Sequence, residues 1–349
     1  MVIGLDIGKY SVKMVQLSKN GEEITIENVG VLNTFDDLNK FNLDNLSKSQ
    51  LSATIQDLAT SLNIKPKKIK HIVSSLSGKS TDVRQITTLD MPDEELIVSL
   101  ELEAKKHIPL DGTDAIIDYH LLGNDSSELD KINVILVTTT KNKVTDHLDI
   151  VKKSGFKAGI FDTDSIALSN LYKHTKPLPK EGADVILNIG HTSTTLIVWG
   201  EKSSFFTRDI EIAGHEINKR IMQELNLDYL SANNKKNELG INAFNQEDES
   251  SKEDGSISIE KRTVFNDLIE EIRKTLRFYM KSNNQSFFNT FYLFGGCANT
   301  PGLKDFISSN LNVKIEDFDP FQNLSNVDSI ENPNQYAIAI GLALRGLEE

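Results

Sequence analysis

Polar residues that could hold a phosphate occur at two turns of the chain. The first turn follows a short apolar segment and reads Asp6-Ile7-Gly8-Lys9-Tyr10-Ser11-Val12-Lys13. The second follows another apolar segment and reads Asn188-Ile189-Gly190-His191-Thr192-Ser193-Thr194. Turns of this kind present backbone N–H groups in a concave arrangement that binds phosphate oxygens. Each turn taken alone is also an ordinary β-turn, so the interpretation depends on what accompanies them.

A third turn contains the adjacent glycines Gly295 and Gly296 after the strand-like segment 290–294. Without side chains there, a flat ligand can approach the backbone closely. The next residue, Cys297, is the only cysteine, which excludes an internal disulfide and a cysteine-cluster zinc site. We expect Cys297 to be a small buried residue, because a reactive thiol needs a neighbouring cation or helix N-terminus.

The elements that carry these turns form an internal repeat. Residues 1–34 contain a short apolar segment and then two segments that alternate polar and apolar side chains, with the hairpin signal Asn20-Gly21 between these two. The segment 183–199 repeats the opening pattern of apolar strand, Ile-Gly turn and alternating strand about 180 residues later. Two related lobes are therefore expected.

Helical periodicity predicts helices over 46–62, 93–107, 143–154, 165–173 and 264–281. Further strands are expected at 71–76, 119–122, 133–138 and 160–162. Pro177, Pro179 and Gly182 indicate a boundary between two units. The polar, acidic segment 246–256 is interpreted as a surface loop.

Length and charge restrict the class of protein. The chain has 349 residues, which favours two or more lobes. It has 38 Lys and Arg against 51 Asp and Glu, a net charge of −13, whereas nucleic-acid and anionic-membrane binders are basic. Neither a secretory signal nor an apolar run of about 18 residues occurs, so we expect a soluble, cytoplasmic protein.

In order and spacing, the three turns resemble the two phosphate motifs and the adenosine motif of the actin/Hsp70/sugar-kinase superfamily. The segments 162–168 and 337–346 resemble its connecting helices. The resemblance implies an α/β fold with two RNase H-like lobes that bind ATP and Mg²⁺ between them.

Other segments are similar to the PilM family, the FtsA-like components of type IV pilus assembly. They are Asp90-Met91-Pro92-Asp93-Glu94-Glu95-Leu96, the segment 103–109, Asp118-Tyr119 and the closing 341–346. The similarity extends over nearly the whole chain. It implies a first lobe of 1–80 with 156–178 and 331–349, an FtsA-type inserted subdomain of 81–155 that binds the partner, and a second lobe of 179–330 with nucleotide-capping helices.

The resemblance also implies a partner. PilM-like proteins capture the N-terminal cytoplasmic tail of the inner-membrane protein PilN between the first lobe and the inserted subdomain. The expected location is therefore the inner face of the inner membrane, beside other pilus components, with homo-oligomers possible. Leu100, Ala104 and Ile108 lie on the predicted helix of that subdomain, where they form either the groove wall or the core.

Several roles follow from the resemblance. Asp6 would hold Mg²⁺, usually through water. Asp164 matches the residue that orients the attacking water, or else it is a helix N-cap. Lys13 either reaches a phosphate or is an exposed strand lysine. The nucleotide-binding positions implied are Asp6, Gly8, Lys9, Tyr10, Ser11, Lys13, Gly190, His191, Thr192, Ser193, Gly214, Lys236, Gly295 and Gly296.

Three positions need separate comment. Asn188 stands where the superfamily pattern has Asp, and an amide cannot act as a base, so slow or absent hydrolysis and weak Mg²⁺ attraction are expected. Asn233 replaces the Glu of an expected Ala-Glu-x-x-Lys motif, whereas Lys236 is retained. His191 either donates to a phosphate or is an exposed turn histidine.

Three functions are compatible with these residues. The favoured one is a scaffold in which ATP stabilises one conformation. The second is an active ATPase or a small-molecule kinase, although no additional carboxylate aimed at a substrate hydroxyl can be singled out. The third is an FtsA-like protein that forms filaments.

Overall fold

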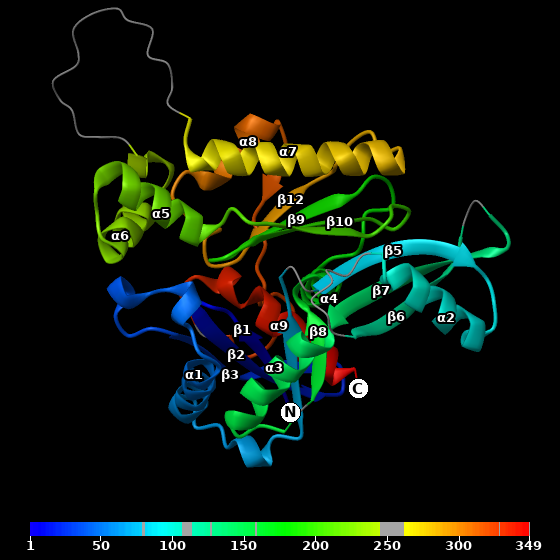
Figure 1. Ribbon diagram of the computed structural model, residues 1–349, viewed down its shortest axis with the longest axis horizontal. Helices are drawn as coiled ribbons and strands as arrows, with labels where there is room; N and C mark the ends of the chain where they lie inside the picture. The colour runs from blue at the N-terminus through cyan, green and yellow to red at the C-terminus, as the bar shows by residue number, and fades with distance from the viewer. Residues whose placement is uncertain are drawn as a thin grey trace, which may run out of the picture.

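The computed structural model describes residues 1–78, 81–106, 114–125, 128–157, 159–244, 262–327 and 329–348. Two lobes lie one above the other, and a smaller subdomain projects from one side (Figure 1). Ile108 and the predicted acidic loop 246–256 lie outside the described residues. Among the helices of these ranges, none combines enough length with enough apolar character to span a bilayer.

The first lobe contains a five-stranded sheet in the order β3-β2-β1-β4-β8. Its strands are β1 (Val2–Ile7), β2 (Ser11–Asn20), β3 (Glu23–Asn33), β4 (His71–Leu76) and β8 (Ile160–Thr163). The first three are antiparallel, as the alternating pattern predicts, while β4 and β8 run parallel to β1. Helices α1 (Lys48–Ser61) and α3 (Lys141–Lys153) bury one apolar face of this sheet.

The second lobe repeats this arrangement in the order β11-β10-β9-β12-β13. The strands are β9 (Asp184–Ile189), β10 (Thr194–Trp199), β11 (Phe206–Ile210), β12 (Phe291–Phe294) and β13 (Ile315–Glu316). Their directions match those of the first sheet, so the repeat expected from sequence is confirmed. The outer face is covered by α5 (Gly214–Leu225), α7 (Val264–Asn283) and α8 (Leu303–Leu311), and α6 (Tyr229–Leu239) packs beside α5.

Two helices lie between the sheets, α4 (Asp164–Thr175) and α9 (Ala337–Leu347). One continuous apolar cluster includes both helices and residues of both sheets. The backbones approach closely here, since a Cβ on Gly4 of β1 would lie 1.9 Å from the carbonyl oxygen of Ala339. A Cβ on Gly341 would lie 1.9 Å from that of Ala167. Only glycine permits these two contacts.

The inserted subdomain is an antiparallel sheet of order β5-β7-β6 covered by one helix. Its elements are β5 (Thr81–Leu89), β6 (Ala115–Asn124), β7 (Lys131–Thr140) and α2 (Asp93–Ala104). Leu96, Leu100 and Ala104 of α2 are buried in its core with side chains of β7. Leu100 and Ala104 are therefore core residues of the subdomain and not part of a groove wall, so their side chains are not available to a partner.

The sequence predicts a subdomain of residues 81–155, whereas its sheet ends at Thr140. The reason is the packing of α3, whose Val151 joins the same core as Ile3 of β1 and Ile55 of α1. Short 3₁₀ helices occur in the connections between these elements. They are η1 (Leu38–Lys40), η2 (Leu43–Asn45), η3 (Pro66–Lys68), η4 (Gly240–Phe244) and η5 (Pro333–Tyr336).

The substitution Gly341→Ala should lower the free energy of unfolding by about 2–3 kcal/mol, because the methyl group would force α9 away from α4. Gly296→Ala is the control, since its Cβ would meet no atom of the described residues within 4 Å. Chemical denaturation of both variants measures the difference. Equal losses would contradict the proposed backbone contact.

Candidate functional site between the lobes

The two predicted phosphate turns follow β1 in the first lobe and β9 in the second. In the first turn, Thr34 at the end of β3 donates its backbone N–H to the carbonyl oxygen of Tyr10 (2.9 Å) and its hydroxyl to that of Lys9 (2.7 Å). In the second, the N-terminal amides of α5 donate to the carbonyl oxygens of Gly190 and His191. These bonds hold the carbonyl side of each turn against its own lobe, which fixes the turn in the shape that presents backbone N–H groups to an anion.

The third turn is docked on the end of β9. The backbone N–H of Cys297 donates to the carbonyl oxygen of Ile189 at 3.0 Å. Gly295 has φ of +92°, and a Cβ there would lie 2.4 Å from the same carbonyl oxygen. Cys297 is buried as expected, and its Sγ would be 2.6 Å from a Cβ on Gly214, the first residue of α5. Both glycines are thus required by close packing.

Asp6 and Lys13 form an ion pair at the end of β1. They are cross-strand neighbours, and the Nζ of Lys13 lies 3.1 Å from Oδ2 of Asp6. Their side chains are only 15% and 11% exposed. The alternative that Lys13 is an exposed strand lysine is therefore wrong, and both charges lie beside the first turn.

Asp164 begins α4 and lies close enough to Asp6 for their charges to interact. Thr163, and not Asp164, is the N-cap, since the Thr163 hydroxyl accepts from the N–H of Ile166. The hydroxyl of Ser75 donates to Asp164 at 2.5 Å. Burial and then the charge of Asp6 raise the pKa of Asp164 to about 7. At neutral pH this carboxyl is thus partly protonated.

Asn188 provides no charge, but a carboxylate lies two strands away. Thr195 of β10 pairs with Asn188 on one side and with Asp209 of β11 on the other. The Thr195 hydroxyl donates to Asp209 at 2.7 Å. Burial raises the pKa of Asp209, although the hydrogen bonds from Thr195 and from the backbone of Gly78 each lower it. Asp209 also acts on Asp164 through its charge, so the second lobe does present an acid to the cleft.

An aromatic cluster bridges the two phosphate turns. The rings of Tyr10 and His191 stack with centroids 4.1 Å apart, and Phe41 lies edge-on to both. The Tyr229 hydroxyl lies 2.8 Å from Nε2 of His191 and 3.0 Å from Nδ1 of His215. Burial and then the charge of Lys236 lower the pKa of His191 well below its usual value. His191 is thus a neutral, bonded ring, and the exposed-histidine alternative is wrong.

Helix α6 faces this cluster with a buried polar group. The Oδ1 of Asn233 accepts from Nζ of Lys236 and from Nδ2 of Asn218, both at 3.1 Å. Lys236 is only 3% exposed. The amide at 233 therefore holds the lysine without the strong charge pairing that a Glu would provide.

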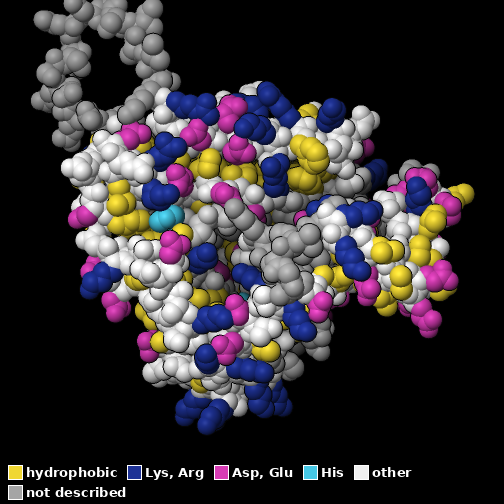
Figure 2. Space-filling model, in the orientation of Figure 1, with side chains coloured by type: hydrophobic (Ala, Val, Ile, Leu, Met, Phe, Trp, Pro, Cys, Tyr) yellow, Lys and Arg dark blue, Asp and Glu magenta, His cyan; other side chains and the backbone are white. Residues whose placement is uncertain are grey.

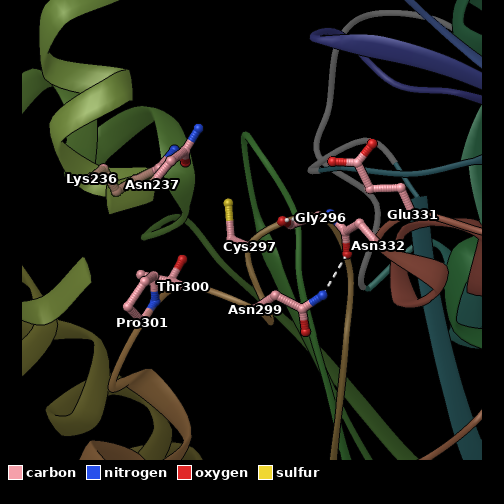
Figure 3. Close-up of a pocket in the computed structure, with 9 residues that line it drawn as sticks. All are labelled: Lys236, Asn237, Gly296, Cys297, Asn299, Thr300, Pro301, Glu331 and Asn332. Carbon is pink, nitrogen blue, oxygen red and sulfur yellow. Dashed lines mark hydrogen bonds between the residues drawn. The ribbon is translucent and has the colours of Figure 1, made fainter. Parts of the chain in front are cut away.

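A pocket of about 350 Å³ opens beside the third turn (Figure 3). Lys236 and Asn237 of α6 lie on one side of it, and Glu331 and Asn332 lie on the other. Its remaining lining residues are Gly296, Cys297, Asn299, Thr300 and Pro301. A mixed polar and small-residue lining of this size suits a base with its sugar.

Most of the positions predicted from sequence lie together in this one cleft. They are the residues of the two phosphate turns, with Asp6 and Lys13, and also Asp164, Gly214, Lys236, Gly295 and Gly296. The cleft also contains four residues that the sequence did not predict, namely Phe41, Asp209, Tyr229 and Glu331. Strand or helix periodicity gives no sign of these residues. Only Asp209 had a signal, since its strand follows the second turn as β3 follows the first.

Comparisons with known proteins agree with this architecture. The family model described as "Type IV pilus assembly protein PilM" matches residues 4–347. A solved structure, "PilM-PilN type IV pilus biogenesis complex", has a TM-score of 0.82 and 23% identity over 100% of this chain and 99% of that chain. Ethanolamine utilization protein EutJ from Carboxydothermus hydrogenoformans has a TM-score of 0.52 and 11% identity over 98% of this chain and 88% of that chain. The predicted actin-like bilobed fold is confirmed.

The pKa of Asp164 can be tested through stability. Because its folded value of about 7 lies above the ordinary 3.8, its protonation stabilises the fold at low pH, and this contribution is lost as the pH rises. Asp164→Asn removes it, so the variant should gain about 2 kcal/mol over the natural chain between about pH 5 and about pH 8. Denaturation at each pH measures this, with Asp57→Asn on the exposed side of α1 as the control. A constant difference between the chains would refute the assignment.

Proposed function

Because this chain belongs to the PilM family of type IV pilus assembly proteins, we propose that it is an ATP-binding scaffold that captures the cytoplasmic tail of a PilN-like inner-membrane protein. Binding of that tail would recruit the chain to the inner face of the membrane. This proposal depends mainly on the match of residues 4–347 to the PilM family model. The two lobes, each with a five-stranded sheet, provide the cleft that a nucleotide needs.

The cleft supports the nucleotide half of the proposal. The pocket of about 350 Å³ would take the base and ribose between Lys236 and Glu331. The turn amides and Lys13 lie at the ends of β1 and β9, where the phosphates of a nucleotide extending from the pocket would lie. Amides and ammonium groups are the donors that phosphate oxygens accept from.

Mg²⁺ would enter with the phosphates. The described part of the chain contains no group of three or more His, Cys, Asp or Glu side chains arranged to hold a metal ion. The charges of Asp6 and Asp209 both act to raise the pKa of Asp164, and a bound cation would offset this repulsion. Mg²⁺ retains most of its waters in such sites, which suits carboxylates that act through water.

Slow hydrolysis follows from the same groups. Asn188 cannot accept a proton from water. The two remaining acids are each engaged by a hydroxyl group, Asp164 by Ser75 and Asp209 by Thr195. With an amide at position 188, one of the two carboxylates that the superfamily pattern places around the metal and the water is missing, so ATP acts mainly as a structural ligand.

The proposed binding of a PilN-like tail is supported by the region where β6 of the inserted subdomain approaches β8 and α9. Asp118 of β6 and Arg345 of α9 both act on Asp162 of β8 through their charges. Burial raises the pKa of Asp162 to about 6, and its Oδ2 has no hydrogen-bond partner among the described residues. Because this oxygen has almost no exposed surface, an incoming chain would have to shift the side chains that cover it before donating to it.

β6 is also an edge strand, and its side chains Ile116, Leu121 and Leu122 are 39–48% exposed. Apolar side chains gather on the projecting subdomain (Figure 2), where α2 adds Ile97, Val98 and Leu102. The edge of β6 that faces away from β7 pairs with no other described strand, and such an edge with apolar neighbours suits an extended peptide that adds a strand.

A synthetic peptide of the PilN-like tail tests the partner proposal by calorimetry. Asp162→Asn should weaken its binding about tenfold, the effect of replacing a charge-assisted hydrogen bond by a neutral one. Asp57→Asn on α1 should leave binding unchanged. Absence of heat with the natural chain at high peptide concentration would contradict the partner, whereas equal affinities would contradict only the role of Asp162.

Asn188→Asp tests the explanation for slow hydrolysis. The restored carboxylate should increase the dependence of ATP binding on Mg²⁺ and raise phosphate release at least about tenfold, since a positioned base contributes that much or more. Phosphate release and calorimetry with and without Mg²⁺ measure both effects, with the exposed Asn310→Asp as the control. Fast hydrolysis by the natural chain would refute the proposal.

A further inference from the structure

The first phosphate turn contains a large aromatic residue where only backbone and small side chains are needed. Tyr10 lies between Lys9 and Ser11, and its carbonyl oxygen is held by Thr34. Its ring leaves the first lobe and stacks on His191 of the second turn. Tyr10 therefore spans the space between the two turns that would receive the phosphates.

The far end of the ring reaches α6. Burial raises the pKa of the Tyr10 hydroxyl, which is also affected by Cys297 and by a hydrogen bond from the Asn233 side chain. The Oδ1 of Asn233 already accepts from Lys236 and Asn218, so its Nδ2 is the group that can donate to Tyr10. Lys236 and Cys297 both line the pocket. The hydroxyl thus ends beside the pocket, while the Tyr10 backbone lies in the first phosphate turn.

Further contacts hold the ring in place. Phe41 contacts the rings of Tyr10, His191 and Tyr229, with centroid distances from 5.0 to 5.6 Å. The nearby Asn39 accepts from the backbone N–H of Leu230 at 3.0 Å, which joins the segment after β3 to α6. The ring is therefore held from both lobes.

We propose that Tyr10 is the specificity-determining residue for the phosphate part of the ligand: its ring occupies the route from the pocket to the two turns, so a nucleoside fits beside it while a nucleoside polyphosphate must displace it. This inference rests on the proposed nucleotide binding. If Tyr10 must be displaced, its stacking on His191 and its hydrogen bond with Asn233 are lost before the phosphates can bind. The phosphates therefore contribute less to the affinity for a nucleotide than their bonds to the turn amides would give alone.

Calorimetry with adenosine, ADP and ATP, each with Mg²⁺, tests the proposal on the full chain. Tyr10→Ser keeps a small hydroxyl residue in the turn and should tighten ATP binding about tenfold, the effect expected from losing one aromatic stack and one hydrogen bond. Adenosine affinity should change less than about twofold, which is within the usual effect of a distant surface change. Tyr10→Phe retains the stack and should give an intermediate result.

Phe278→Ala is the matched control, because this aromatic ring is 57% exposed on α7, outside the cleft cluster. Hydrogen exchange of the backbone amides in the two phosphate turns can be measured without any ligand. The exchange should be faster in Tyr10→Ser than in the natural chain and unchanged in Phe278→Ala. Faster exchange indicates that the ring shields the turns in the natural chain.

Four outcomes would overturn the proposal. Weaker ATP binding in Tyr10→Ser would mean that the ring contacts the nucleotide. Equal tightening of adenosine and ATP would mean that it controls lobe closure alone. Measurable affinities that are the same in Tyr10→Ser and the natural chain would refute the role of Tyr10 but leave nucleotide binding intact. If none of the three ligands binds either chain, the nucleotide proposal fails as well.

Discussion

The arrangement of this protein depends on the backbone contact of α9 with β1 and α4. Gly4 and Gly341 let a helix approach a strand and another helix without intervening side chains. Because α4 and α9 share one apolar core with both sheets, this contact sets how the lobes face each other. The two phosphate turns follow strands of these sheets, so their separation follows from the same packing.

That separation explains the chemistry of the cleft. Acids that would be ordinary on a surface become coupled, and burial raises the pKa of Asp164 and Asp209. The same proximity lets the ring of Tyr10 reach His191 and α6. The cleft therefore combines donors suited to a phosphate with a side chain that competes for the same space.

The cleft is also connected to the inserted subdomain. β4 contributes Ser75, whose hydroxyl donates to Asp164, and a backbone hydrogen bond of Gly78 reaches Asp209. β5 follows directly and leads into the subdomain, where the Gln85 side chain accepts from the backbone of Phe205 in the second lobe. One short segment thus contacts both acids before it enters the proposed partner-binding region.

The sequence by itself determined the local elements, the repeat and the residues of the three turns. These depend on periodicity and on turn chemistry, which act between neighbours in the chain. It also showed that position 188 has no carboxylate. Only the tertiary structure decided that Asp209 lies two strands away, that Leu100 is core, and that Tyr10 stacks on His191. These contacts join residues far apart in sequence, and they depend on packing distances between lobes that no local pattern encodes.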